Sequence, residues 1–446
     1  MENVVSETQH DVVIIGGGPG GSTAAALLAE HGRKVVLFEK EVFPRFHIGE
    51  SLLPYNLDLF DRLGLNERLH KTFVEKWGAH LISSTGVVTR YIKFAEGWKP
   101  GHPMAYHVLR SEFDHILLQR AAELGADVRE GHPVVEATHS HRDGCVVTAR
   151  RPDGSLTTVR ARFLLDASGQ DAFIASRRRL RKMTPKLRKA AVFAHYEGVP
   201  RGVGRGATDI TLIVLSNGWF WVIPLADGKT SVGLVTEGAH IKESGMPPTQ
   251  LLEEAIRRCP AAQHKMRHAR RISDVWTASD YSYECGGIAG DGYLLIGDAA
   301  AFIDPVFSTG VWLAMSSGEL AADTVHRALG TPTTPGDLSP AVFAAYERKV
   351  RKHVATYTEM VTHFYQPGFF DLFLQPSEHS RLKGAVVSLL AGFADPPPLM
   401  RFRLWWFYKL VELQQHFKHT KPVPLLKLLE EAPPDMPIAE IYGMAQ

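Results

Sequence analysis

The sequence predicts an α/β protein: a Rossmann-like nucleotide-binding domain with an inserted, mostly antiparallel β-sheet and a helical C-terminal region. Three observations lead to this prediction. The chain begins with a strand, a glycine-rich turn, a helix and a second strand; between about residues 180 and 280 short alternating runs are typical of strands; and from about residue 340 the apolar residues follow helical spacing. We therefore expect one module over residues 1–330, with the inserted sheet at about 180–280, and a helical region over residues 331–446.

The first βαβ unit is the clearest element. Asp11–Ile15 is a short, β-branched apolar run, which is typical of a buried strand. Ser22–His31 is rich in Ala and Leu and predicts a helix that ends at Gly32, and Lys34–Phe38 predicts the next strand. Two parallel strands joined by a crossover helix indicate a Rossmann-like sheet.

Later elements follow from the same periodicities. The sequence predicts a helix over Ser111–Leu124 with Ser111 as its N-cap, core strands at Arg160–Leu165 and Tyr293–Ile296, strands of the inserted sheet at Thr208–Leu215, Trp219–Pro224 and Thr230–Val235, and a helix over Gly310–Leu329. Prolines at 367, 376 and 396–398 break the helical C-terminal region.

Composition narrows the class of protein. Of the 446 residues, 45% are hydrophobic and 22% are charged, and the net charge of +2 is too small to suggest a nucleic-acid-binding protein. No apolar run reaches the roughly 18 residues of a membrane-spanning helix, and the polar N-terminal residues show no signal peptide. Three scattered cysteines suit a reducing compartment, and we expect a cytoplasmic protein without a structural metal.

Two segments leave alternatives open. The basic run comprises Arg177, Arg178, Arg179, Arg181, Lys182, Lys186, Arg188 and Lys189. It predicts either a solvated face or a docking surface for an acidic protein. The aromatic and basic segment Leu399–Leu410 predicts either a helix packed on the body of the protein or a contact with a membrane surface.

The glycine turn predicts a dinucleotide site. Gly16, Gly18 and Gly21 follow a strand and open a helix, where they permit a tight turn, close approach of the backbone to a pyrophosphate, and close packing of the helix on the strand. The helix N-terminus offers free N–H groups to the phosphates. Glu39, at the end of the second strand, is placed to accept hydrogen bonds from the adenosine ribose.

Three downstream segments indicate FAD rather than NAD. Arg110 with Phe113 and Asp114, the segment Asp166–Gly169, and the segment Tyr293–Ala300 with Asp298 resemble, in this order, the flavin-side motifs of FAD-dependent aromatic hydroxylases. The chain has a single GxGxxG motif, so we expect no resident nicotinamide domain. Reduced flavin would then come from a separate NAD(P)H-dependent reductase, although single-component hydroxylases also lack such a domain.

Further motifs resemble the flavin-dependent halogenases. They are Gly49-Glu50-Ser51, Lys76 with Gly78-Ala79, the WxWxIP run Trp219–Pro224, and Asp304–Gly310. The resemblance covers nearly the whole chain up to about residue 330, and WxWxIP together with the lysine is its specific part. Together the resemblances imply that FAD is held by Gly16, Gly18, Pro19, Gly21, Ser22, Glu39, Lys40, Arg45, Gly49, Glu50, Ser51, Arg110, Asp166, Gly169, Gly297, Asp298, Pro305, Gly310 and Val311.

In this family reduced FAD, O2 and chloride or bromide give hypohalous acid. The resemblance implies that halide lies at Ser308, Thr309 and Gly310, where a helix begins and free N–H groups suit an anion. The other interpretation of these residues is an ordinary serine N-cap with a glycine packed near the flavin. Lys76 is implied as the residue that takes up the halogen, either by hydrogen-bonding hypohalous acid or as a haloamine, although most lysines are solvated surface charges.

The resemblance also bears on the substrate. Trp219, Trp221 and Pro224 are implied to wall the flavin off from the organic substrate, and the alternative is aromatic filling of a sheet core. Tryptophan halogenases carry a glutamate where this chain has Phe307, which favours an activated phenol or pyrrole, free or tethered to a carrier protein. Which base, if any, accepts the ring proton stays open, and the candidates are His80, His107 and Tyr106.

The C-terminal region is expected to cap the substrate cavity. Its aromatic residues, which either line that cavity or form core, are Phe364, Tyr365, Phe369, Phe370, Phe373, Trp405, Trp406, Phe407 and Tyr408. Two other functions share the predicted fold: a flavin monooxygenase or geranylgeranyl-reductase-like enzyme, and a flavoprotein without catalytic activity. Halide-dependent product formation distinguishes the halogenase from both.

Overall fold

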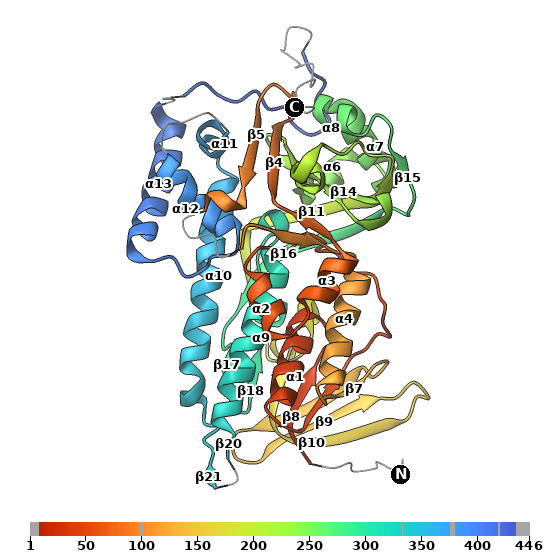
Figure 1. Ribbon diagram of the computed structural model, residues 1–446, viewed down its shortest axis with the longest axis vertical. Helices are drawn as coiled ribbons and strands as arrows, with labels where there is room; N and C mark the ends of the chain where they lie inside the picture. The colour runs from red at the N-terminus through yellow and green to blue at the C-terminus, as the bar shows by residue number, and fades with distance from the viewer. Residues whose placement is uncertain (1–8, 98–101, 332, 375–379, 418–419, 434–446) are drawn as a thin grey trace.

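The computed structural model describes residues 9–97, 102–331, 333–374, 380–417 and 420–433. The nucleotide-type sheet lies at one end of the elongated molecule and a second sheet lies at the other end (Figure 1). The long helix α10 (Ala344–Phe364) runs beside both parts, and the remaining C-terminal helices lie next to the second sheet. The predicted α/β fold class is confirmed.

The first sheet has a parallel centre. Its strands β18 (Tyr293–Leu295), β10 (Leu156–Asp166), β1 (His10–Ile15), β2 (Val35–Phe38) and β7 (Asp127–Arg129) pair in that order, each parallel to the next. Strands β17 (Ala289–Gly290), β8 (Val134–Ser140) and β9 (Gly144–Arg150) add antiparallel pairs. Burial on both faces explains the unbroken apolar runs from which these strands were predicted.

Helix α1 (Pro19–Glu30) packs against both α4 (Arg110–Glu123) and α9 (Thr309–Ala328). Glycines allow the close contact with α9, because a Cβ at Gly318 would lie 2.4 Å from the carbonyl oxygen of Gly20. Helices α2 (Asn56–Arg62) and α3 (Asn66–Thr72) follow on the same side of the molecule (Figure 1). The N-terminal part of α1, which follows the glycine turn, therefore lies directly against α9.

The second sheet is mostly antiparallel, as expected. Its order is β19 (Ala301–Phe302), β16 (Trp276–Cys285), β11 (Arg181–Glu197), β14 (Thr230–Glu237), β13 (Gly218–Pro224), β12 (Ile210–Val214), β4 (Gly78–Ser83) and β5 (Thr89–Lys93), with β15 (Arg270–Arg271) beside β11. Only β12 and β4 are parallel among the described pairs of this sheet.

Two features of this sheet differ from the prediction. Strands β4 and β5 come from residues 78–93, outside the interval of 180–280, because β4 pairs with a strand far away in the sequence. Within that interval the chain also forms helices α6 (Gly238–Ser244), α7 (Pro248–Arg258) and α8 (Pro260–Lys265). Non-local pairing of this kind leaves no periodic signal in the sequence.

The C-terminal helices after α10 are α11 (Pro367–Phe373), α12 (Ser380–Leu390) and α13 (Pro398–Phe417). Helix α13 packs on α11 and α12 and buries Met400, Leu404 and Phe407, while Phe402 and Trp405 stay 60% and 49% exposed. The segment Leu399–Leu410 is therefore a packed helix with an aromatic outer face. In the described ranges, no helix combines the length and apolar character needed to cross a bilayer.

Two local expectations need correction. Helix α4 begins at Arg110 with Leu109 as its N-cap and no side-chain cap, so Ser111 is not the cap. The Arg110 side chain bonds one turn ahead to Asp114 at the start of this helix. The basic run does not form one solvated face either, because Lys189 is only 6% exposed and pairs with Glu237 at 3.3 Å. The Lys186 side chain and residues 1–8 lie outside the described part.

Candidate active site

The turn between β1 and α1 has three different kinds of glycine. Gly16 has φ +101°, and a Cβ there would lie 2.4 Å from the carbonyl oxygen of Ala167, so a side chain is excluded. A Cβ at Gly21 would lie 1.9 Å from the carbonyl oxygen of Gly16. A Cβ at Gly18 would meet only Arg45 Nη2, at 3.8 Å. The middle glycine therefore leaves space above an uncapped helix N-terminus, which fits a pyrophosphate.

Glu39 closes this turn at the end of β2. Its Oε2 accepts a hydrogen bond from Gly17 N at 2.6 Å, its Oε1 accepts one from Glu41 N at 2.9 Å, and the side chain is buried. Lys40 pairs with Asp171 at 2.5 Å on the surface. The carboxylate is held where the chain turns after β2, the position expected for a ribose acceptor.

Two arginines meet at one carboxylate. Arg110 forms a bidentate pair with Asp114 at 2.7 and 2.9 Å, and it also donates to the carbonyl oxygen of Ile48 at 2.6 Å. Arg45 Nη1 lies 3.2 Å from Asp114 Oδ2. Gly49 has φ +103°, and a Cβ there would lie 2.9 Å from Arg110 Nη1. The segment that contains Gly49 is thereby fixed against the start of α4.

The carboxylates after β10 and β18 have different surroundings. Asp166 accepts hydrogen bonds from Ser168 N, Ser168 Oγ and Ile174 N at 3.1, 2.5 and 2.7 Å, so it shapes its own loop. Asp298 lies in the short helix η5 (Gly297–Ala299), and burial raises the pKa of its carboxyl to about 7, opposed by the charge of Arg110. A half-buried carboxyl that has no direct cation partner among the described residues suits a polyol ligand such as a ribityl chain.

The start of α9 is a helix N-terminus whose surroundings can be compared with those that suit an anion. Pro305 lies in η6 (Pro305–Phe307), and Ser308 follows with φ 58°. Ser308 is the N-cap residue of α9, but its side chain makes no capping hydrogen bond. Helix α9 therefore does not have the ordinary serine cap. A Cβ at Gly310 would meet nothing within 4 Å, so the first turn, including Thr309 and Val311, presents free N–H groups at an open position.

Lys76 is buried. It ends β3 (Val74–Lys76), which pairs with β6 (Ala105–His107), and it is 3% exposed. Its Nζ donates to Ser51 Oγ at 2.9 Å and to the carbonyl oxygen of Leu52 at 3.1 Å, and it lies 5.0 Å from the centroid of the Phe94 ring. Burial lowers the pKa of Lys76 to about 7, and the charge of Asp209 opposes this shift. Ammonium and neutral amine are thus both accessible near neutral pH.

Asp209 anchors the segment that follows Lys76. Its Oδ1 accepts from Trp77 N at 2.5 Å and from Gly78 N at 2.8 Å, and its Oδ2 accepts from the Tyr91 hydroxyl at 2.7 Å. The side chain is 3% exposed. Sequence reasoning missed this residue, because an acid in front of an apolar strand carries no signal of the distant peptide groups that it binds.

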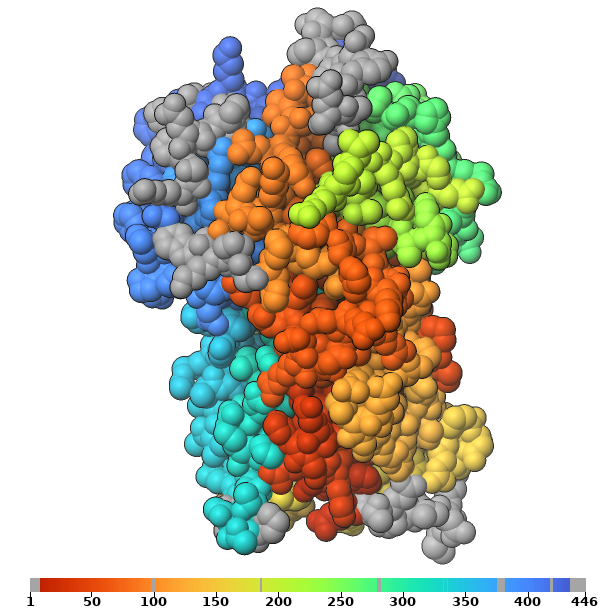
Figure 2. Space-filling view, viewed as in Figure 1, coloured from red at the N-terminus to blue at the C-terminus, as the bar shows by residue number. Residues whose placement is uncertain are grey.

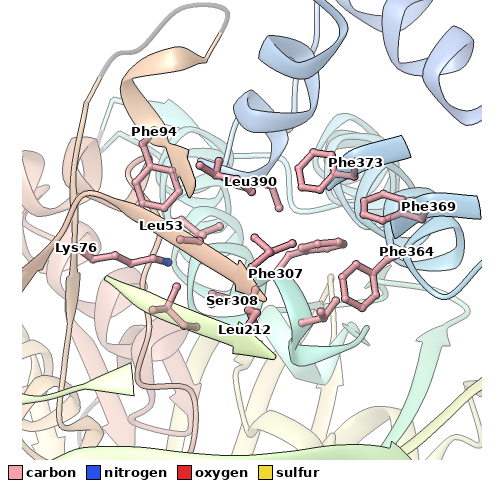
Figure 3. A pocket seen from close by; sticks show the side chains of 15 residues that line it. Leu53, Lys76, Phe94, Leu212, Phe307, Ser308, Phe364, Phe369, Phe373 and Leu390 are labelled. Atoms are coloured by element: carbon pink, nitrogen blue, oxygen red, sulfur yellow. The ribbon is translucent and has the colours of Figure 1, made fainter. Parts of the chain in front are cut away.

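Lys76 and Ser308 line the same cavity (Figure 3). The lysine amine points into it from β3, and Phe307 and Ser308 lie across from it. The other side is formed by C-terminal residues, of which Phe364, Phe369, Phe373 and Leu390 are labelled in Figure 3. The cavity measures about 40 Å³ and is almost entirely apolar, with Lys76 as its only charged lining residue among those described.

The other C-terminal aromatic residues do not line this cavity. Phe370, Phe407 and Tyr408 are buried core, whereas Trp405 and Trp406 are exposed. Tyr365 links two parts of the site: its hydroxyl accepts from Trp219 Nε1 at 3.1 Å and donates to Asp304 Oδ2 at 2.9 Å. Burial raises the pKa of that Asp304 carboxyl. Figure 2 shows the early, red-to-orange part of the chain between these C-terminal helices and the green α6–α8 segment.

The WxWxIP residues lie on two faces of β13. Trp219 and Trp221 belong to the main core, with their ring centroids 6.0 Å apart, and Trp221 Nε1 donates to Ser231 Oγ at 3.0 Å. Side chains alternate along a strand, so Pro224 points to the opposite face and lines a different cavity. The structure therefore brings the two tryptophans together but does not bring Pro224 to them.

The three candidate bases lie outside the Lys76 cavity. His80 stacks on Tyr91 at 4.4 Å on the other face of the sheet. His107 is fully buried, its ring nitrogens have no hydrogen bond of good geometry among the described residues, and burial lowers its pKa well below the usual value. Burial raises the pKa of Tyr106. None is placed to take a proton from a ring in the cavity.

A buried pair near Ser51 was also missed. Glu50 Oε1 lies 2.9 Å from His195 Nε2, and Glu50 Oε2 has no hydrogen-bond partner among the described groups although the residue is 1% exposed. Unsatisfied buried oxygens in a native fold call for a ligand or water. The motif in the sequence identified Glu50, but no motif identified His195, which lies near the C-terminal end of β11.

Comparison of the sequence and the fold with known proteins identifies the class of protein to which this site belongs. The family described as FAD binding domain matches residues 9–359. The chain is 30% identical to the 1H-pyrrole-2-carbonyl peptidyl-carrier-protein chlorinase of Pseudomonas fluorescens, over 87% of this chain and 90% of that protein. It is 33% identical to the corresponding brominase of Pseudoalteromonas luteoviolacea, over 86% and 92% of the two chains.

A solved structure agrees with these relatives. The flavin-dependent brominase Bmp2 superimposes with a TM-score of 0.80 and 29% identity, over 92% of this chain and 99% of that one. The protein is thus an FAD-binding enzyme, and the chain belongs to the flavin-dependent halogenases. This confirms the resemblance found in the motifs and the use of FAD and halide, and it favours the halogenase over the monooxygenase or reductase interpretation.

Proposed function

We propose that this protein is the halogenating component of a two-component system, in which a separate NAD(P)H-dependent reductase supplies FADH2 and Lys76 passes the halogen to an electron-rich aromatic ring. The observation that carries the proposal is the cavity that Lys76 and Ser308 share. Bound as FADH2, the cofactor would supply, with O2, the oxidising power that converts chloride or bromide into hypohalous acid.

The residues at hand fit the parts of this proposal. The open position at Gly18 and the uncapped start of α1 fit the pyrophosphate, and Glu39 and Asp298 fit the sugar and ribityl hydroxyls. The open first turn of α9, at Thr309 and Gly310, fits a halide ion. Trp219 and Trp221 would help to keep the organic substrate away from the flavin.

Lys76 can act on hypohalous acid in either protonation state. As an ammonium it donates a hydrogen bond to the oxygen of hypohalous acid. As an amine it attacks the halogen: an N–halogen bond forms, the O–halogen bond breaks, and an N–H proton joins the departing hydroxide to give water. A ring carbon then takes the halogen, the ring loses its proton, and the amine is restored. A pKa of about 7 makes the amine available without strongly alkaline conditions.

The cavity wall supports a pyrrole or phenol as the substrate. Phe307 faces Phe364 at 5.2 Å, and no carboxylate of the described residues lines the cavity to assist an unactivated ring. The two curated relatives act on a pyrrole carbonyl group held by a peptidyl carrier protein. A volume of about 40 Å³ is well below the ~150 Å³ of an apolar cavity that admits benzene, so side chains such as Phe373 and Leu390 must move when a ring enters.

The test is a halogenation assay with FAD, a flavin reductase, NADH and bromide, offering carrier-bound pyrrole-2-carbonyl and free phenols, with product masses as the readout. We expect Lys76→Met to lower product formation by at least about 100-fold, in the range of positioned proton-transfer groups, while FAD binding is retained. Lys93→Met is the matched control, since Lys93 is an exposed lysine on neighbouring β5.

Two results would contradict the proposal. Undiminished halogenation by Lys76→Met would remove the lysine from the reaction. Full turnover with NADH in the absence of any reductase would show that the enzyme reduces its own flavin.

A further inference from the structure

A second cavity lies on the other face of the inserted sheet. Strand β4 lines both spaces with alternate residues: Ala79 and Leu81 face the Lys76 cavity, whereas His80 and Ile82 face the second one. We call this second space the far cavity. It measures about 320 Å³, which is at the lower end of the range for small-molecule sites.

The charges in the far cavity are unbalanced. Its single acid among the described lining residues is Asp209, whose two oxygens are already used by Trp77, Gly78 and Tyr91. Two of its cations, Arg201 and Lys265, form no ion pair with any described residue. Within the described residues, Arg201 donates to backbone carbonyl oxygens alone, at 2.6 Å to Leu225 and 3.2 Å to Lys229.

Lys265 is the second such cation. No ion pair within the described ranges involves it, and burial, followed by the charge of Arg267, lowers its pKa. Lys265 and Arg201 both line the far cavity, so an anion bound there would offset the cost of holding two cations away from bulk water.

Thr230 also lines this cavity. Thr230 is 1% exposed, and its Oγ1 has no hydrogen-bond partner among the described residues. It follows Lys229, whose carbonyl oxygen accepts from Arg201, so Thr230 and Arg201 belong to the same part of the cavity wall. Buried hydroxyls are almost always bonded, and this one is available to a ligand. The remaining wall includes the apolar side chains of Val199, Val222 and Pro224.

We propose that the far cavity is a binding site for a small organic anion, separate from the flavin and from the Lys76 cavity. A carboxylate or phosphate group lies between Arg201 and Lys265, and Thr230 donates its hydroxyl proton. The apolar part of the ligand packs on Val222 and Pro224. The aliphatic wall and the cationic end of the far cavity together favour an amphipathic anion over a neutral molecule or a small inorganic ion.

The probe for this site is benzoate, with neutral benzyl alcohol as its uncharged counterpart, titrated calorimetrically into the FAD-loaded enzyme. We expect saturable binding of one benzoate, at least about tenfold tighter than benzyl alcohol, and a loss of about tenfold in Lys265→Ala. Thr230→Val, which removes no side-chain hydrogen bond to a described residue, should weaken binding about threefold to tenfold without loss of the fold. Exposed Lys242 supplies the control Lys242→Ala, which should bind as the wild type does.

Lys76→Met distinguishes the two cavities and should leave benzoate affinity unchanged. The proposal is overturned if benzoate does not bind, if benzyl alcohol binds equally well, or if Lys76→Met rather than Lys265→Ala abolishes binding. Should Lys265→Ala fail to fold, an unchanged affinity in Thr230→Val has the same consequence. Each of these results is independent of halogenating activity, so failure of the proposed lysine chemistry would not affect them.

Discussion

Replacing Asp209 by asparagine is expected to shift the pH dependence of halogenation to lower pH. Asp209 is the charge that opposes the effect of burial on Lys76, whose pKa is about 7. Without that negative charge, burial acts alone and the pKa of Lys76 falls further. One side of the pH–activity profile reflects the ionisation of Lys76: the acid side if the amine reacts, and the alkaline side if the ammonium reacts. The midpoint of that side therefore moves to lower pH.

The expected size of the effect follows from general electrostatics, and the structure shows which substitution isolates it. A single carboxylate near a lysine contributes about one pKa unit or more, equivalent to about 1.4 kcal/mol. Asparagine keeps an oxygen for Trp77 N and Gly78 N, and its amide can donate to the Tyr91 hydroxyl, so the geometry is retained. Alanine would leave two N–H groups without acceptors, at a cost of about 1–3 kcal/mol each. The loss of stability could then not be separated from the change in the pH dependence of activity.

The assay is halogenated product formed per turnover between pH 5.5 and 9, with FADH2 supplied in excess. Tyr91→Phe is the matched control, because it removes the hydrogen bond to Asp209 Oδ2 and leaves the charge in place. The midpoint that reports Lys76 should move by about one pH unit in Asp209→Asn and stay unchanged in Tyr91→Phe. Identical pH profiles for wild type and Asp209→Asn would refute the electrostatic link between Asp209 and Lys76.

Three further outcomes are expected. Lys76→Met should remove a pH dependence of stability. The folded-state pKa of Lys76 lies below the ordinary value of 10.5, so the stability of the wild type rises with pH between about 7 and 10.5, by about 3 kcal/mol from pH 7 to 9.5. Urea unfolding of both proteins at these two pH values checks this difference. Gly18→Val should abolish FAD binding and keep the fold, because a Cβ at Gly18 meets only Arg45, at 3.8 Å. Gly21→Ala should disrupt the fold, because a Cβ at Gly21 would lie 1.9 Å from Gly16. Circular dichroism reports the fold and flavin fluorescence reports FAD binding, and a folded, FAD-free Gly21→Ala would argue against the packing role of Gly21. Trp219→Phe should cost about 1 kcal/mol by removing the hydrogen bond to Tyr365, and a calorimetric scan without any loss would show that the bond contributes nothing.

Local sequence was sufficient for some parts of the fold. The run Asp11–Ile15, the glycine turn and the following helix were predicted within a few residues of β1 and α1, because buried parallel strands and helix starts have short-range signals. The helix after Ser308 was likewise predicted close to its observed start. By contrast, the partners of β12 were not, since its parallel neighbour β4 comes from residues 78–83.

The same division holds for the site. Motifs named Lys76, Glu50 and Ser308, but the groups that control them, Asp209 and His195, belong to other segments and have no motif. Pro224 shows the opposite case: adjacent in the motif to the tryptophan pair, it is separated from it by strand alternation.

The amino-acid sequence by itself determined the class of cofactor and the chemical groups available, because glycine turns, strand ends and helix starts depend on neighbours along the chain. Only the tertiary structure decided that the Lys76 amine is buried with its pKa near 7 and that it shares a cavity with the start of α9. The physical reason is that burial, desolvation and cavity shape are sums over contacts from distant segments, here β3, α9 and the C-terminal helices, and no single segment carries that information.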